Sequence, residues 1–227
     1  MKLSVIIPVY NEVGTILEII KKVQLVKIDI DKEIIVIDGA STDGTKEKLK
    51  QVENQPDIKI VYETKREGKG MAVRKGFEIA TGDVAIIQDA DLEVSPDEYP
   101  FLLKHIFSNE SEVIFGSRFM NKNSKFRFMS LLANKIIIFL VNLLYNTNMS
   151  DVLTCYKVIK TSILKDIKFE CKGFDFDTEI VVKILKKGIK IKEIPIAYFP
   201  RTYGQGKKIN WKDGFKSVYI LLKNKFI

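Results

Sequence analysis

The sequence predicts an α/β fold in which a mostly parallel central sheet is flanked by helices. Short runs of β-branched residues alternate with amphipathic stretches through the first half of the chain, as in strand–helix–strand crossover units. Polar segments that contain glycine follow several of these runs. A length of 227 residues, with 46% hydrophobic and 29% charged residues, fits one folded domain over residues 1–227.

Elements of the first half are distinguished by the period of their apolar residues. Strands are predicted where β-branched and other apolar residues run together, and helices where apolar residues recur every three or four positions. The predicted strands are 3–8, 33–37, 58–62 and 83–88, and the predicted helices are 14–23, 42–52 and 70–80.

The second half continues with both kinds of element. Its predicted helices are 96–107, 129–145, 177–187 and one that begins at Trp211, and its predicted strands are 113–117, 154–159 and 191–197. The helix at 129–145 is strongly apolar but shorter than the ~20 residues that span a bilayer. Asn134, Lys135 and Asn142 also interrupt it. We expect it to pack on the core or to lie in a membrane interface.

Composition narrows the classes of function. A formal net charge of +8 suits partners that carry phosphate, such as an anionic membrane, a phosphorylated small molecule or nucleic acid. No nucleic-acid-binding motif is present, so nucleic acid is not an expected partner. Two cysteines and one histidine argue against a zinc site or a histidine-based triad. The chain begins directly with an apolar strand pattern, so we expect no signal peptide and a cytoplasmic location.

The polar segments follow predicted strands, and ligands of parallel sheets bind at the carboxyl ends of strands. Segments 8–12, 38–45 and 89–93 should therefore converge at one edge. Asp89 and Asp91 are spaced to hold a hard divalent cation, Mg²⁺ or Mn²⁺, that bridges substrate phosphates. The same pair could instead shape a turn. Lys69, between two glycines ahead of a helix, is a candidate phosphate contact.

Four motifs in order carry a family resemblance: VIIPVYNE at 5–12, VIDGASTDGT at 36–45, EGKGMAVRKGFEIATGD at 67–83 and DADLE at 89–93. With them the chain resembles the family-2 glycosyltransferases of the GT-A fold. In the second half, GSRF at 116–119, SDVLTCYK at 150–157 and GFDFDTE at 173–179 are similar to the dolichol-phosphate mannose synthase-like branch.

The resemblance implies roles for individual residues. It implies a metal site at Asp89 and Asp91 that Glu93 assists, and catalytic roles for Asp91 and Asp151. The expected donor-binding residues are Pro8, Tyr10, Glu12, Asp38, Lys69, Asp89, Ala90, Asp91, Arg201 and Lys208. The expected acceptor-binding residues are Arg118, Arg127 and Ser130.

The implied reaction is an inverting, metal-dependent transfer of a sugar from a GDP- or UDP-sugar to a polyprenyl phosphate, either dolichyl or undecaprenyl. The apolar helix at 129–145 and the basic residues near it favour this lipid acceptor and a peripheral position at the cytoplasmic membrane face. Alternatives are a sugar hydroxyl acceptor, for which Asp151 would serve as base, and an inactive nucleotide-sugar-binding module.

Two departures from the family pattern stand out. Gly39 lies where the family often has the second of two paired aspartates, which leaves the base of the donor open. We also expect this sequence to lack the trailing transmembrane helices that many relatives carry.

Overall fold

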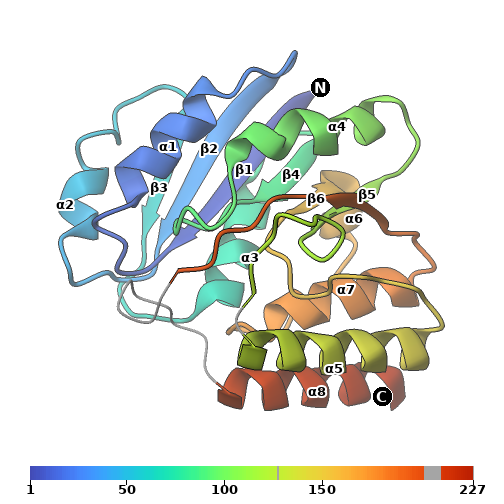
Figure 1. The fold of residues 1–227 in the computed structure, drawn as a ribbon. Coiled ribbons are helices and arrows are strands. Elements are labelled where there is room, and N and C mark those ends of the chain that lie inside the picture. Colours follow the sequence, from blue (N-terminus) through green and yellow to red (C-terminus); the bar gives the residue numbers. More distant parts are fainter. Residues whose placement is uncertain (127, 202–210, 227) are drawn as a thin grey trace.

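A seven-stranded sheet forms the centre of the molecule, in a computed structural model that describes residues 1–126, 128–201 and 211–226 (Figure 1). The strand order is β3-β2-β1-β4-β6-β5-β7. The strands are β1 Lys2–Val9, β2 Asp31–Asp38, β3 Ile58–Tyr62, β4 Val84–Ile87, β5 Val113–Ser117, β6 Lys157–Lys160 and β7 Lys192–Pro195.

Most strand pairs are parallel. β1 pairs in parallel with β2 and with β4, and β3 extends β2 in the same direction. β6 runs antiparallel to both β4 and β5, and β7 is parallel to β5. The predicted mostly parallel α/β sheet is confirmed, and its parallel half brings the carboxyl ends of β3, β2, β1 and β4 to one edge.

Helices cover both faces of the sheet. The helices are α1 Ile16–Leu25, α2 Thr45–Leu49, α3 Lys69–Ile79, α4 Tyr99–Phe107, α5 Phe128–Tyr145, α6 Thr161–Lys165, α7 Phe176–Lys186 and α8 Trp211–Phe226. Residues of α1 and α4 share one core with one side of the sheet, and those of α3, α5, α6, α7 and α8 share the other. α5 and α8 lie side by side outside α7 (Figure 1).

Close packing explains part of this arrangement. At Gly76 of α3, a Cβ atom would lie 2.4 Å from Cγ2 of Ile6 in β1, so only glycine lets the helix approach the sheet at this point. None of the described helices combines the length and the apolar character needed to cross a membrane.

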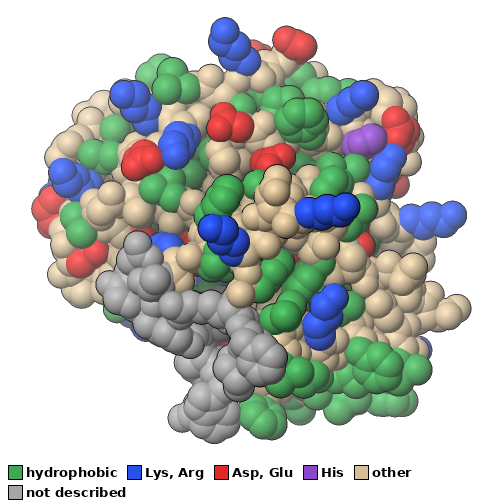
Figure 2. Space-filling view, viewed as in Figure 1, with side chains coloured by type: hydrophobic (Ala, Val, Ile, Leu, Met, Phe, Trp, Pro, Cys, Tyr) green, Lys and Arg blue, Asp and Glu red, His purple; other side chains and the backbone are tan. Residues whose placement is uncertain are grey.

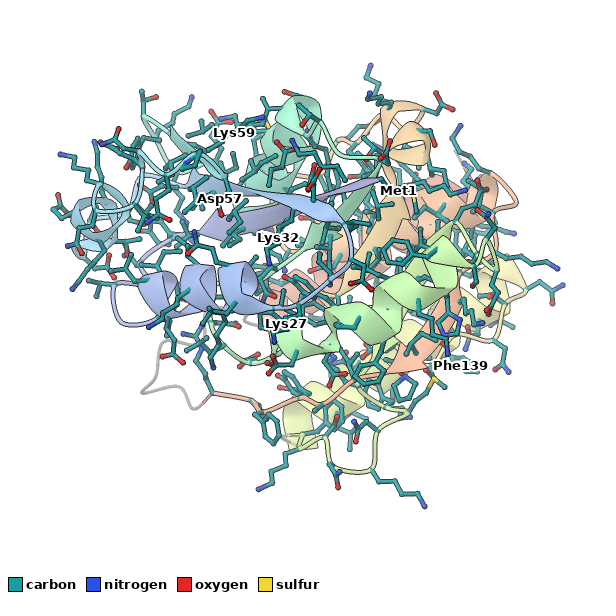
Figure 3. The ribbon with its side chains drawn as sticks, turned by 90° about the horizontal axis from the view of Figure 1, so that it is seen from above. Met1, Lys27, Lys32, Asp57, Lys59 and Phe139 are labelled. Carbon is teal, nitrogen blue, oxygen red and sulfur yellow. The ribbon has the colours of Figure 1, made fainter. Side chains whose placement is uncertain are left out.

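The opposite edge of the sheet is tied together by a buried carboxylate. Glu33 of β2 accepts hydrogen bonds from Ser4 Oγ of β1 at 2.6 Å, Lys59 Nζ of β3 at 2.9 Å and the backbone N–H of Thr81 at 2.7 Å. Figure 3 shows Lys32 of β2 and Lys59 of β3 in this part of the sheet, and Asp57 just before β3 interacts electrostatically with Lys32. This edge holds the strands together, and ligands of parallel sheets bind at the other, carboxyl edge.

Candidate active site

Three loops follow β1, β2 and β4, which are neighbours in the sheet, so the predicted convergence at one edge is confirmed. Each loop contains a residue other than glycine in the left-handed region, namely Asn11 at φ 51°, Ala40 at φ 58° and Leu92 at φ 62°. Such conformations are uncommon for alanine and leucine and cluster at functional sites. The loops therefore have specific shapes that the surrounding packing must hold.

Gln88, which directly follows β4, fixes the position of the loop after this strand. This side chain is buried, and its Oε1 accepts hydrogen bonds from the hydroxyls of Tyr99 at 2.7 Å and Tyr156 at 2.8 Å. Its Nε2 donates to the backbone oxygen of Asp89 at 3.0 Å. Helix α4 and the segment before β6 thus set the position at which Asp89 and Asp91 emerge.

Asp91 lies beside a pair of charged groups from opposite ends of the chain. Arg201 donates from both terminal nitrogens to the carboxylate of Glu12, at 2.8 and 3.0 Å, and Nη2 also lies 3.4 Å from Oδ2 of Asp91. Such two-bonded arginine–carboxylate pairs are among the stronger polar contacts. Arg201 and Glu12, both predicted donor contacts, therefore meet at the carboxylate loop.

The pKa of Asp91 is affected by its burial and by the carboxylates near it. Burial, followed by repulsion from Asp89 and Glu93, raises the pKa of Asp91 to about 7, although the positive charge of Arg201 opposes this shift. Repulsion from the two neighbouring carboxylates thus adds to the cost of burying a charged Asp91, and a bound cation would relieve both effects.

Glu93 accepts hydrogen bonds from the segment that leads to Arg201. One carboxylate oxygen accepts the backbone N–H of Arg201 at 2.7 Å, and the other accepts the hydroxyl of Tyr198 at 3.1 Å. Among the described residues, no group of three acidic, histidine or cysteine side chains is placed to hold an ion. Asp89 and Asp91 offer the hard oxygen ligands that Mg²⁺ and Mn²⁺ use. The part of Glu93 in such a site stays a prediction.

Lys69 faces Asp89 from the start of α3. Its Nζ lies 2.9 Å from Oδ1 of Asp89 and 3.3 Å from Oδ2 of Asp177. Asp177 in turn accepts a 2.7 Å hydrogen bond from the fully buried Lys157. Burial alone would lower the pKa of Lys69, but the charges of Asp177 and Asp89 raise it above its usual value. Lys69 thus stays a cation at the same edge.

The remaining predicted donor contacts lie around the first two loops. Pro8 is part of β1, Ala90 is buried between the two aspartates, and Tyr10 is half-buried beneath the guanidinium of Arg66, 4.2 Å from its ring centroid. Asp38 is buried and accepts the backbone N–H of Ser41 at 3.3 Å. These positions share the carboxyl edge with Asp89 and Asp91.

The predicted acceptor residues form a second group. Arg118 donates from Nε and Nη2 to the two oxygens of Asp151, at 2.7 and 2.8 Å, and from Nη2 to Asn134 of α5 at 3.2 Å. Asp151 is fully buried. Ser130 lies in the first part of α5, where its backbone oxygen accepts a bond from Asn134. The predicted contacts Arg127 and Lys208 lie outside the described residues.

Tyr198 connects the two groups, and sequence reasoning missed it. Its hydroxyl binds Glu93, while the guanidinium of Arg118 lies 5.0 Å from its ring centroid. Sequence reasoning also gave no role to the buried Lys157 and Asp177 behind Lys69, although both lie in the motifs at 150–157 and 173–179 that carry the resemblance.

Comparisons with known proteins find relatives along nearly the whole chain. The model of the family described as Glycosyl transferase family 2 matches residues 4–168. A dolichol-phosphate mannosyltransferase from Pyrococcus furiosus is 30% identical over 98% of this chain and 64% of its own length. The low-salt glycan biosynthesis hexosyltransferase Agl6 from Haloferax volcanii is 30% identical over 98% of this chain and 53% of its own length.

Solved structures share the fold. Glucosyl-3-phosphoglycerate synthase from Mycobacterium tuberculosis, in complex with Mn²⁺, uridine diphosphate and glucosyl-3-phosphoglycerate, superposes with a TM-score of 0.77 and 18% identity. The match covers 100% of this chain and 80% of that one. The chain spans less than two thirds of the two curated relatives, but the family model covers most of it, and the expected GT-A fold is confirmed. The chain belongs to glycosyl transferase family 2.

Proposed function

We propose that the protein transfers a sugar from a GDP- or UDP-sugar to a polyprenyl phosphate, in one displacement that inverts the anomeric carbon. The observation that carries the proposal is the meeting of Asp89 and Asp91 with Lys69 and Arg201 at the carboxyl edge of the sheet. Two acidic ligands beside two cations are suited to a diphosphate that carries a divalent metal.

The donor half of the reaction uses these four side chains. Asp89 and Asp91 would hold the metal, Mg²⁺ or Mn²⁺, which stabilises negative charge on the departing diphosphate when bound. Lys69 and Arg201, paired with carboxylates in the structure, donate to phosphate oxygens as charge develops on them. The Mn²⁺ and uridine diphosphate in the glucosyl-3-phosphoglycerate synthase complex support this cofactor class.

The acceptor half of the reaction uses Arg118. Its Nε and Nη2 are occupied by Asp151 and Asn134, whereas Nη1 has no hydrogen-bond partner among the described residues. A phosphate acceptor is already anionic, so it needs a cation to hold it and no base to activate it. A fully buried Asp151 that binds Arg118 through both oxygens suits the role of positioning this guanidinium.

A lipid acceptor also requires a surface that meets the membrane. Both α5 and α8 expose large hydrophobic side chains at intervals of four, three and four residues, which places them along one stripe of each helix. The stripes consist of Leu132, Ile136, Phe139 and Leu143 on α5 and Phe215, Tyr219, Leu222 and Phe226 on α8. We call these eight residues the apolar double stripe.

The apolar double stripe is suited to lie in a membrane interface. Hydrophobic side chains gather over α5 and α8 along the lower right of the molecule (Figure 2). Lys135, Lys216 and Lys225 on the same helices are exposed, and they add positive charge for anionic lipid head groups. The similarity to a dolichol-phosphate mannosyltransferase supports the same acceptor class. We therefore propose peripheral contact at the cytoplasmic membrane face.

A transfer assay tests the proposed function. The protein is incubated with Mn²⁺, a panel of UDP- and GDP-sugars and a short polyprenyl phosphate, and mass spectrometry looks for a sugar joined to the lipid phosphate. A parallel set offers free sugars as acceptors. Glycosylated polyprenyl phosphate is the expected product. Transfer only to sugar hydroxyls would contradict the acceptor, and no turnover of any donor would contradict the reaction.

A further inference from the structure

A buried carboxylate oxygen without a partner lies at the β2–β3 corner of the carboxyl edge. Glu63 follows β3 directly, and its backbone N–H donates to the backbone oxygen of Asp38 at 2.8 Å. The side chain is only 2% exposed. Oε1 accepts a hydrogen bond from Nζ of Lys75 at 2.6 Å, but Oε2 has no hydrogen-bond partner among the described residues. A buried acceptor without a hydrogen bond is unfavourable, so this oxygen calls for an explanation.

Gly39 leaves space beside this oxygen. A Cβ atom added to Gly39 would lie 3.7 Å from Oε2 of Glu63, 3.8 Å from Cβ of Tyr10 and 3.4 Å from the oxygen of Val9. These are ordinary contact distances, and Gly39 does not have the positive φ that would require glycine. The backbone therefore tolerates a side chain at position 39, and its absence leaves a methyl-sized space in contact distance of Cβ of Tyr10 and Oε2 of Glu63.

The place of this corner identifies the part of a donor that would reach it. Gly39 directly follows Asp38, the last residue of β2, and the loop with Asp89 and Asp91 follows β4, two strands away along the same edge. A nucleotide whose diphosphate lies at Asp89 and Asp91 can extend its nucleoside along that edge toward β2 and β3. Tyr10 presents a ring there on which a flat group, the guanidinium of Arg66, already stacks.

We propose that Glu63 recognises the base of the nucleotide donor, and that its Oε2 accepts a hydrogen bond from a ring N–H of that base. This inference rests on the proposed function. Uracil at N3 and guanine at N1 carry such a hydrogen beside a carbonyl group. Cytosine and adenine present an unprotonated ring nitrogen at the equivalent place, and its lone pair faces the carboxylate unfavourably. Glu63 thus selects uridine and guanosine diphosphates over cytidine and adenosine diphosphates.

Isothermal titration with UDP, GDP, CDP and ADP in the presence of Mn²⁺ tests this selection. We expect the wild-type protein to bind UDP or GDP roughly 10- to 100-fold more tightly than CDP and ADP, and the tighter of the first two identifies the base. In Glu63→Gln, Lys75 retains the amide oxygen and the amide N–H₂ faces the space beside Gly39. The preference should therefore shrink at least tenfold or reverse toward CDP and ADP.

Two further variants keep the test specific. Glu67 is the second acid near Lys75, at 3.6 Å, so Glu67→Gln removes the same charge without altering Oε2 and should keep the wild-type preference. Gly39→Ala narrows this space at a tolerated position and should weaken UDP and GDP alike.

The outcomes separate the two proposals. An unchanged preference in Glu63→Gln, or a wild-type protein that binds all four nucleotides equally, overturns the role of Glu63 and leaves the proposed function standing. A wild-type protein that binds none of the four contradicts the proposed function, and the role of Glu63 with it.

Discussion

Asp151 is the residue for which two chemical roles predict different measurements. As a base for a hydroxyl acceptor it would need access to the acceptor, whereas in the structure it is buried and holds Arg118 through both oxygens and through the backbone N–H of Arg118 at 3.0 Å. This geometry suits the positioning role, because both oxygens of the buried carboxylate already bind the guanidinium.

Substituting Asp151→Asn tests this at constant size. The weaker hydrogen bonds of an amide should loosen Arg118, raising KM for the polyprenyl phosphate about tenfold, while kcat and donor KM change little. A general base would instead be worth about 10²–10⁴ in kcat. Steady-state kinetics separates the two. Asn134→Ala, which removes the other contact of the same guanidinium, should act in the same direction but less strongly.

Single residues also show where sequence reasoning reaches its limit. Asp89 and Asp91 could be placed at a strand end because their apolar strand and their spacing are local features. The pairing of Glu12 with Arg201 joins positions 189 residues apart, and no local pattern encodes it. The attachment of Glu93 to the backbone of Arg201 is likewise a product of tertiary packing.

Elements were predicted best where apolar runs end in turn residues. Strands 58–62 and 113–117 match the structure at both ends, as β3 and β5. The helix predicted at 42–52 is shorter, Thr45–Leu49, because Asp43 bonds the backbone N–H of Thr45 and Gly44 at φ 98° precedes the first turn. The helix α6, Thr161–Lys165, was missed, since five residues are too few to display a helical period.

One strand boundary was set by side-chain chemistry. The strand predicted at 154–159 is Lys157–Lys160, because ladder pairing begins at Lys157 opposite Phe115 and the preceding Tyr156 turns its hydroxyl to Gln88.

The apolar helix predicted at 129–145 forms as Phe128–Tyr145. Its pattern left core packing and a membrane interface open, and the structure buries Ile137, Ile138 and Val141 while exposing the stripe on the other side.

The apolar double stripe yields a prediction at the scale of these helices. Phe139 is 63% exposed, and burying a side chain of this size in an apolar environment is worth about 1.5–3 kcal/mol. Phe139→Asp should therefore reduce binding to anionic lipid vesicles by at least about tenfold in a flotation assay. Phe101 of α4 is also 63% exposed and lies outside the stripe, so Phe101→Asp is the matched control. Equal flotation of the two variants would argue against membrane contact by this face.

At the scale of the whole molecule, the two edges of the sheet divide structure from function. The carboxyl edge gathers the acidic loops, Lys69 and Arg201, and it contains the unusual backbone conformations at Ala40 and Leu92. The opposite edge is tied by Glu33, whose partners come from β1, β3 and the turn before β4. Stability and activity should therefore respond to different substitutions.

Glu33 makes the stability of the fold depend on pH. Burial alone would raise its pKa, but hydrogen bonds from Lys59, Ser4 and Thr81 lower it well below the usual value of 4.5. Stability from this group is therefore complete above pH 4.5 and is lost as the pH falls below it.

Glu33→Gln should lower the free energy of unfolding at pH 7 by about 1–3 kcal/mol and make the loss of stability in acid less steep. Urea denaturation at several pH values measures both effects. Glu18→Gln, which removes an exposed partner of Lys22 in α1, should change stability by less than about 0.5 kcal/mol. A variant at Glu33 as stable as the wild type would contradict the role of this carboxylate.

We propose that Asp89 and Asp91 hold a metal-bound diphosphate during sugar transfer to a polyprenyl phosphate. The most direct measurement is the rate of that transfer by wild-type protein and Asp91→Asn, with Mn²⁺, with excess chelator, and with Mn²⁺ restored. We predict that chelator abolishes wild-type transfer reversibly and that Asp91→Asn lowers it at least about 100-fold while remaining folded. Full transfer in chelator, or by Asp91→Asn, would contradict the account.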